Sequence, residues 1–294
     1  MNWKQSYHPY ALITVIFWAL AYVFSRLAMV HFSPYPLGLL RYVVATIFLA
    51  FVVVIGKIRP PKAQDFPWFI ACGAAGFFLY MLTFNRGTQL VPAATSSVVI
   101  ATAPVMTAFL ARIFFGEKLA PYQWGAIGIE FCGIIVLTWE DGGFQLNEGI
   151  LWLLGAALAL STYNLLQRKV TKQYDAVTIS SYSIFCGTAM LLIFAPQAVE
   201  ELQSAPPGQY INLLVLGIFA SALAYLSWAK AFAKAKNTAS VSNYMFVTPF
   251  FTAVFGFVFA QEVPDGKTLL GGLIILCGVV LFFHKNFVAH QQKG

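Results

Sequence analysis

Long apolar stretches follow one another along almost the whole of this chain. A helix needs about 20 apolar residues to cross the hydrocarbon core of a bilayer, and stretches of that length recur through all 294 residues. Charged residues make up 10% of the chain, against about 25% in soluble domains. We therefore predict an all-α integral membrane protein with no extramembrane domain. Its ten predicted transmembrane helices are 9–30, 34–55, 66–87, 92–115, 121–139, 149–169, 176–196, 210–233, 238–260 and 268–287.

The chain also repeats itself. Pro104 and Pro249 each lie near the middle of an apolar stretch, 145 residues apart, and the pair Glu117 and Glu262 has the same spacing. With five predicted helices in each half, the second half must enter the membrane from the opposite side. We therefore predict an inverted-topology 5+5 repeat, with repeats at 1–145 and 146–294.

The two prolines indicate where a ligand would bind. A proline inside a helix removes a backbone donor and frees carbonyl groups, and in a bilayer such groups persist only where protein or a water-filled cavity satisfies them. Interrupted helices at matching positions of two repeats are typical of the binding site of a transporter. The sequence therefore predicts a substrate site between Pro104 and Pro249.

The basic residues predict the orientation. With both termini in the cytoplasm, fourteen Lys and Arg side chains lie on the inner side, and only Arg26, Arg86 and Lys267 lie near outer ends. This bias follows the positive-inside rule. The net charge of +7 is therefore explained by topology, and we expect the partners to be the lipid bilayer and a small-molecule substrate, with no nucleic acid.

Motifs of enzymes are missing from the sequence. It has no P-loop, no HExxH, no GxSxG and no Gly-rich dinucleotide fingerprint. The four cysteines show no paired spacing for zinc or for a redox pair. We predict that the chain is not an enzyme and that it uses no cofactor and no metal.

Several short motifs resemble the duplicated EamA module of the drug/metabolite transporter superfamily. They are Phe17-Trp18-Ala19 with Tyr22-Val23, Arg41-Tyr42-Val43-Val44-Ala45, Phe115-Gly116-Glu117, and Gln123-Trp124 with Gly128 and Gly133. The resemblance covers the whole chain and is closest to bacterial ten-span exporters of aromatic and other amino acids. It implies a bacterial inner-membrane protein in which two five-helix bundles surround a cavity lined mainly by the first, third, fourth, sixth, eighth and ninth helices. Small-residue faces on the fifth and tenth helices are compatible with a monomer or a homodimer.

Polar and aromatic residues at mid-depth on those six helices are the predicted substrate-binding residues. Asn164 and Asn243 are costly in lipid and are expected to face the interior. For any single Tyr or Trp the alternative is that it fills space between helices. Thr102 and Thr248 lie at the same depth as the predicted binding residues. The predicted set is Trp18, Tyr22, Tyr80, Phe84, Ser97, Pro104, Tyr163, Asn164, Gln167, Tyr225, Trp228, Asn243, Tyr244 and Pro249.

Two charged residues lie inside predicted helices, and we assign them structural or gating roles. Arg41 lies about 10 Å into the second helix at 1.5 Å per residue. An intramembrane Arg is a functional-site hypothesis by default, and the alternative is a fixed donor to helix-end carbonyls. Glu130 has Ile275 as its repeat counterpart, so we expect a neutral, hydrogen-bonded acid and not a proton-coupling group.

The predicted function is export of amino acids and similar amphipathic metabolites by alternating access, without proton coupling. A multidrug antiporter of the same fold would need a carboxylate in the cavity, and a phosphorylated-metabolite antiporter would need several basic residues, of which Arg41 is the only deep one. A membrane enzyme or scaffold remains the alternative of another class, although neither needs two-sided symmetry.

Overall fold

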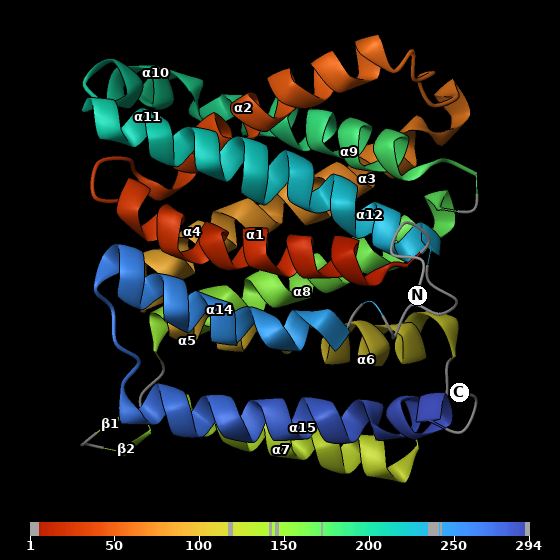
Figure 1. Cartoon of the computed structure of the whole chain (residues 1–294), viewed down its shortest axis with the longest axis vertical. Coiled ribbons are helices and arrows are strands. Elements are labelled where there is room, and N and C mark those ends of the chain that lie inside the picture. Colours follow the sequence, from red (N-terminus) through yellow and green to blue (C-terminus); the bar gives the residue numbers. More distant parts are fainter. Residues whose placement is uncertain are drawn as a thin grey trace.

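The computed structural model describes residues 6–116, 120–140, 143–144, 147–171, 173–234, 241 and 243–291. These residues form a layered bundle of antiparallel helices (Figure 1). Within them, seven helices are long and apolar enough to cross a membrane, and Pro121–Leu137, Thr248–Ala260 and Gly266–Phe282 are shorter apolar helices. The only strands in this part of the chain are β1 (Trp139–Glu140) and β2 (Gly143–Phe144), which pair antiparallel and have two residues each. The all-helical prediction is confirmed, whereas the number of ten crossings stays a prediction.

The first half of the chain contains six helices and one π-helical segment that bear on the site. They are α1 (His8–Ala28), α2 (Pro34–Ile55), α3 (Phe66–Gly73), η3 (Ala74–Leu79), α4 (Tyr80–Leu90), α5 (Ala93–Ile100) and α6 (Ala103–Phe115). Segment η3 is a π-helical stretch that joins α3 and α4 without a loop. Helix α7 (Pro121–Thr138) closes this half.

The second half has a similar order of elements. They are α8 (Glu148–Val170), α9 (Ala176–Leu191), α10 (Ala195–Gln203), α11 (Pro207–Leu214), η5 (Val215–Leu223), α12 (Ala224–Lys234), η6 (Asn243–Val247), α14 (Thr248–Phe255), η7 (Gly256–Ala260) and α15 (Gly266–Gln291). Segments η5 and η7 are π-helical. The stretch between the predicted helices 176–196 and 210–233 contains most of α10, and Pro196 fits the first turn of this helix.

Helix α1 begins and α15 ends on the same side of the bundle, at the right in Figure 1. The loops 29–33 and 261–265 lie at the opposite end. This arrangement is the one expected if both termini are on one side of a membrane. Which side is cytoplasmic stays a prediction from the charge bias.

Both proline-containing stretches are interrupted and not merely bent. In the first, α5 ends at Ile100 and α6 starts at Ala103, with Pro104 as its second residue. In the second, the 3-10 segment η6 ends where α14 starts, and Pro249 is again the second helical residue. A proline is tolerated there because the first-turn N–H groups have no intrahelical acceptor. Both prolines therefore start a new helix.

The two proline helices match in register. Helix α6 starts at 103 and α14 at 248, which is an offset of 145 residues. The chain then turns through a left-handed residue at Gly116 (φ 66°) and at Gln261 (φ 55°), again 145 residues apart. The same offset thus relates both the starts of these helices and the turns that follow them.

Helices α7 and α15 form a pair along one edge of the bundle (Figure 1). Their backbones approach at glycines: a Cβ added to Gly133 would lie 2.5 Å from Ile275 Cγ1 and 2.9 Å from the carbonyl oxygen of Gly271. Glu130 is buried in this pair, where a Cβ at Gly278 would lie 2.7 Å from its Cγ. Oε1 of Glu130 has no hydrogen-bond partner among the described residues, which differs from the hydrogen-bonded acid that we expected.

Candidate functional site

A cavity of about 30 Å³ lies in the centre of the bundle. It is bounded by α1, α2, α4, α5, α8 and α12 and by the interrupted segment that contains η6 and α14. These elements include the six helices that the family resemblance implied, together with α2. The lining residues are Trp18, Ala21, Tyr22, Arg41, Tyr80, Phe84, Ser97, Ile100, Ala101, Leu160, Tyr225, Met245 and Thr248.

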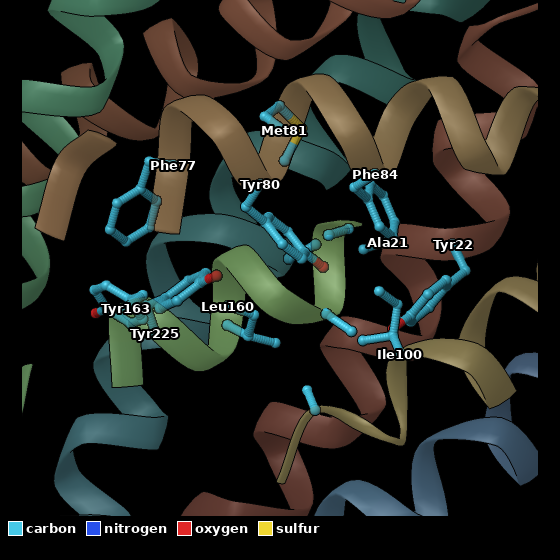
Figure 2. Packing of buried hydrophobic residues seen from close by; sticks show 14 of the residues in the cluster. Ala21, Tyr22, Phe77, Tyr80, Met81, Phe84, Ile100, Leu160, Tyr163 and Tyr225 are labelled. Atoms are coloured by element: carbon cyan, nitrogen blue, oxygen red, sulfur yellow. The ribbon is translucent and has the colours of Figure 1, made fainter. Parts of the chain in front are cut away.

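Aromatic side chains form one wall of the cavity. Tyr80 and Phe84 are four residues apart on α4 and therefore share a face, and their rings stack at 5.3 Å between centroids. Tyr22 on α1 meets Phe84 edge-on at 5.2 Å. Figure 2 shows the side chains of α1, α4 and α8 converging, with Leu160 opposite Tyr80.

A second aromatic group lies toward the end of the bundle where α1 begins. Trp18 packs on Tyr225 at 5.5 Å and on Trp228 at 4.9 Å between ring centroids. Tyr225 also contacts Tyr163, at 6.4 Å, and both rings appear together in Figure 2. Trp228 and Tyr163 therefore lie behind the lining residues and support them, and the structure does not place either at the cavity surface.

Arg41 is the charged residue of the cavity. Its side chain is 3% exposed. Nε donates to Ser221 Oγ at 2.7 Å, and Nη2 donates to the carbonyl oxygen of Ala220 at 3.4 Å. Nη1 has no hydrogen-bond partner in the described part of the chain. Both acceptors lie in η5, so that a π-helical segment holds the guanidinium in place.

The interrupted helices supply the remaining polar groups. Thr248, the first residue of α14, is buried and lines the cavity, and its Oγ1 has no hydrogen-bond partner among the residues described. The hydroxyl of Ser97 donates to the carbonyl oxygen of Ala94 at 2.7 Å. Both proline-containing stretches thus contribute to the same cavity, although Pro104 and Pro249 themselves do not line it.

Several predicted binding residues lie elsewhere. Nδ2 of Asn164 is 3.5 Å from Thr107 Oγ1 on α6, so this amide joins two helices outside the cavity. Gln167 does not line the cavity either. Tyr244 shares a hydrogen bond with Nδ1 of His8 at 2.6 Å, near the start of α1. The backbone of Asn243 begins η6, and its side chain lies outside the described residues.

The sequence analysis missed five lining residues, Ala21, Ile100, Ala101, Leu160 and Met245. All are apolar, so nothing in their chemistry separates them from residues that face lipid. Ala21 could have been found because it precedes Tyr22, and Ile100 and Ala101 because they end the helix before Pro104.

A polar cluster closes the bundle on the other side of the cavity from Trp18. Arg26 on α1 forms an ion pair with Glu262 and donates to the carbonyl oxygens of Thr88 and Val91. The second carboxylate oxygen of Glu262 accepts from the backbone N–H of Ala93. We call these groups the Arg26 cluster. It joins α1, α4, α5 and the loop before α15, about 6 Å along α1 from Tyr22 at 1.5 Å per residue.

The comparisons with known proteins agree with this architecture. The EamA-like transporter family matches the chain twice, at residues 5–139 and 147–284. A protein of Streptantibioticus cattleyicolor described as a "probable terminal-alkyne amino-acid exporter" is 30% identical over 99% of this chain and 98% of its own length. The uncharacterized transporter YdfC of Bacillus subtilis is 28% identical over 93% and 91%.

More distant relatives have the same extent. An S-adenosylmethionine uptake transporter of Rickettsia bellii is 23% identical over 92% of this chain and 91% of its own. A crystal structure of a protein that is 17% identical has a TM-score of 0.61 and covers 96% of this chain and 99% of its own, which supports the fold alone. The family match spans nearly all of the bundle that surrounds the cavity, and we conclude that this multi-pass membrane protein belongs to the EamA-like transporter family of the drug/metabolite transporter superfamily.

Proposed function

We propose that this protein exports amino acids with apolar or aromatic side chains by alternating access through the central cavity. The observation that carries the proposal is the meeting of two interrupted helices, α5–α6 and η6–α14, with an aromatic wall at one cavity. An aromatic and hydroxyl-lined cavity suits an amphipathic solute, because ligand pockets are mostly apolar with a few placed polar groups. The 30% identical relative that is described as an amino-acid exporter supports the choice of substrate class.

The volume of the cavity supports alternating access. At about 30 Å³ it is far smaller than the roughly 300–1,000 Å³ of ordinary ligand pockets. The Arg26 cluster lies at one side of it, and the contact of Trp18 with Trp228 lies at the other. Substrate entry would therefore require one of these contacts to separate, and release would require the other.

The inverted repeat would supply the two states. The double family match, the 145-residue offset of α6 and α14, and the ends of α1 and α15 on one side of the bundle all support repeats at 1–145 and 146–294. The charge bias supports an orientation in a bacterial inner membrane with cytoplasmic termini. Labelling of single cysteines placed at Glu148 and at Lys62 tests this orientation: Glu148→Cys is expected to react from outside intact cells, and the reverse pattern would invert the topology.

Transport itself is tested with purified protein in liposomes. A panel of labelled amino acids, with S-adenosylmethionine as a comparison, is expected to show counterflow of phenylalanine or leucine above that of protein-free vesicles. Exchange of S-adenosylmethionine with no exchange of any amino acid would refute the proposed substrate class.

We further propose that transport is not coupled to protons. Glu130 is the buried acid of α7, but it lies in the α7–α15 pair and does not line the cavity. Glu130→Gln is expected to transport as the parent does, with no effect of an imposed pH gradient on either. Uphill accumulation that the gradient drives and that Glu130→Gln abolishes would make Glu130 the coupling residue.

A further inference from the structure

The Arg41 guanidinium is a buried cation without a counter-charge. Within the described residues the ion pairs are Arg26 with Glu262 and Arg86 with Glu148, and Arg41 takes part in neither. Its hydrogen bonds go to a neutral hydroxyl and a carbonyl group. Removing a charge from water without an ionic partner costs several kcal/mol, and neutral acceptors offset this cost only in part.

Part of the guanidinium is buried without a partner in the part of the chain that the structure describes, on a residue that lines the cavity. Arg41 lines it, and Nη1 is buried without a hydrogen-bond partner among the residues described. Thr248 Oγ1, also buried and without a partner there, lines the same cavity from α14. Two residues that line the cavity from different halves of the chain thus each have one buried polar atom without a partner in the described part of the chain: a charged donor of Arg41 and the hydroxyl of Thr248.

The position of Arg41 is rigid. Helix α2 lies so close to η5 that a Cβ at Gly217 would meet Val44 Cβ at 2.5 Å and the carbonyl oxygen of Arg41 at 2.9 Å. The guanidinium carbon lies 5.6 Å from the ring centroid of Tyr42. Since Nε and Nη2 are already bonded to η5, Nη1 is oriented before a ligand arrives, and preorganised donors lose less entropy on binding.

We propose that Arg41 binds the carboxylate of the transported amino acid, an assignment that rests on the proposed function and narrows it. One carboxylate neutralises one guanidinium, and hydrogen bonds between charged groups are about twice as strong as neutral ones. Trp18 and Tyr225 line the same cavity and are suited to the ammonium group, because aromatic rings attract cations. The proposed substrate is therefore a zwitterion, which is expected to bind better than an amine or an amide that lacks the carboxylate and better than a phosphate dianion, whose second charge has no partner among the described lining residues.

Competition in proteoliposomes tests the assignment. Counterflow of labelled phenylalanine is measured against unlabelled phenylalanine, phenylalaninamide, which lacks the carboxylate, and phenyl phosphate. For the parent protein, phenylalaninamide is expected to compete at least about tenfold more weakly than phenylalanine, as the loss of one charge-assisted hydrogen bond implies. In Arg41→Gln the amide and the acid are expected to compete about equally. A purely structural Arg41 would change the amount of active protein without changing this ratio.

Two further variants secure the result. Arg41→Lys keeps the charge but loses the planar fork, so it is expected to retain a reduced preference for the acid. If Arg41→Gln does not insert into the membrane, the preference of Arg41→Lys for phenylalanine over phenylalaninamide tests the assignment. Gly125→Ala on α7, where a Cβ meets no atom within 4 Å, is the control and is expected to match the parent.

The outcomes separate the two proposals. If the parent transports phenylalanine but does not distinguish it from the amide, or if Arg41→Gln and Arg41→Lys keep the full preference, the role of Arg41 is refuted and the transport function stands. If phenyl phosphate competes better than phenylalanine, the anion site belongs to a phosphorylated substrate. If the parent transports no amino acid, both proposals fall.

Discussion

The contact of α7 with α15 allows a sharp prediction about stability. A Cβ at Gly133 would lie 2.5 Å from Ile275 Cγ1, 2.9 Å from the carbonyl oxygen of Gly271 and 3.0 Å from the backbone nitrogen of Ile275. Ordinary carbon contacts are about 3.5–4.0 Å, and two of these atoms belong to backbone that cannot change rotamer. Gly133→Ala therefore requires the two helices to move apart.

The expected change in the free energy of unfolding is the difference between two opposing terms. Overpacking costs about 1–3 kcal/mol, and replacing Gly by Ala inside a helix returns about 1 kcal/mol. We expect Gly133→Ala to lower the free energy of unfolding by up to about 2 kcal/mol. Gly128→Ala on the same helix is the matched control, because a Cβ there meets no atom within 4 Å, and it is expected to be neutral or to gain up to about 1 kcal/mol.

Thermal unfolding of the purified proteins in detergent measures both variants side by side. The expected order of Tm is Gly128→Ala at or above the parent, and Gly133→Ala several degrees below it. Substrate preference is expected to stay the same in both, because α7 and α15 do not line the cavity. Equal Tm values for the two variants would show that the glycine contact does not hold this pair together.

Three shorter predictions concern other contacts. Arg26→Gln and Glu262→Gln are expected to lower Tm by less in combination than as a sum, since both break the Arg26 cluster; additive losses would contradict this. Asp265→Ala is expected to destabilise by about 1 kcal/mol at pH 7 through loss of the cap on α15. The hydrogen bond from Thr268 lowers the pKa of Asp265, so this contribution is present above the unfolded pKa and disappears as pH falls through the lower folded pKa; a gap in Tm that persists at pH 2 would be inconsistent with it. Trp228→Ala is expected to reduce transport more than Asn164→Ala, because Trp228 packs on the lining residue Trp18 whereas the amide of Asn164 contacts Thr107 on α6; the opposite order of counterflow rates would move the site toward α6.

The helices could be predicted closely from the sequence because the bilayer imposes one length on every crossing. The predicted span 34–55 coincides with α2, and 121–139 exceeds α7 by one residue. The prediction that no helix lies between 196 and 210 was wrong, because α10 starts at Ala195 with Pro196 in its first turn. Local chemistry does not separate the end of one helix from the start of the next, since a proline is compatible with both positions.

The lining of the cavity was predictable where polarity or aromatic character distinguishes a residue from its lipid-facing neighbours, and substrate binding by these residues stays a prediction. Trp18, Tyr22, Tyr80, Phe84, Ser97 and Tyr225 line the cavity as expected. Asn164 shows the limit of this reasoning. An amide in a membrane needs a hydrogen-bond partner, which can be another helix and not a cavity, and here Thr107 Oγ1 on α6 is that partner. The π-helical segments could not be foreseen, and they place Arg41 against Ser221.

Those π-helical segments affect how the cavity of such a protein can change during evolution. Segment η3 runs directly into Tyr80, and η5 ends two residues before Tyr225. Each residue of an α-helix turns the chain by about 100°. A π-helical turn contains more residues, so it changes the direction in which all later side chains of the helix point. Loss of one residue from either stretch would leave the part of the helix before the deletion in place and would turn the part after it, with its tyrosine, by about 100°. An insertion or deletion at these two places is therefore a single-step route to a different cavity on an unchanged scaffold.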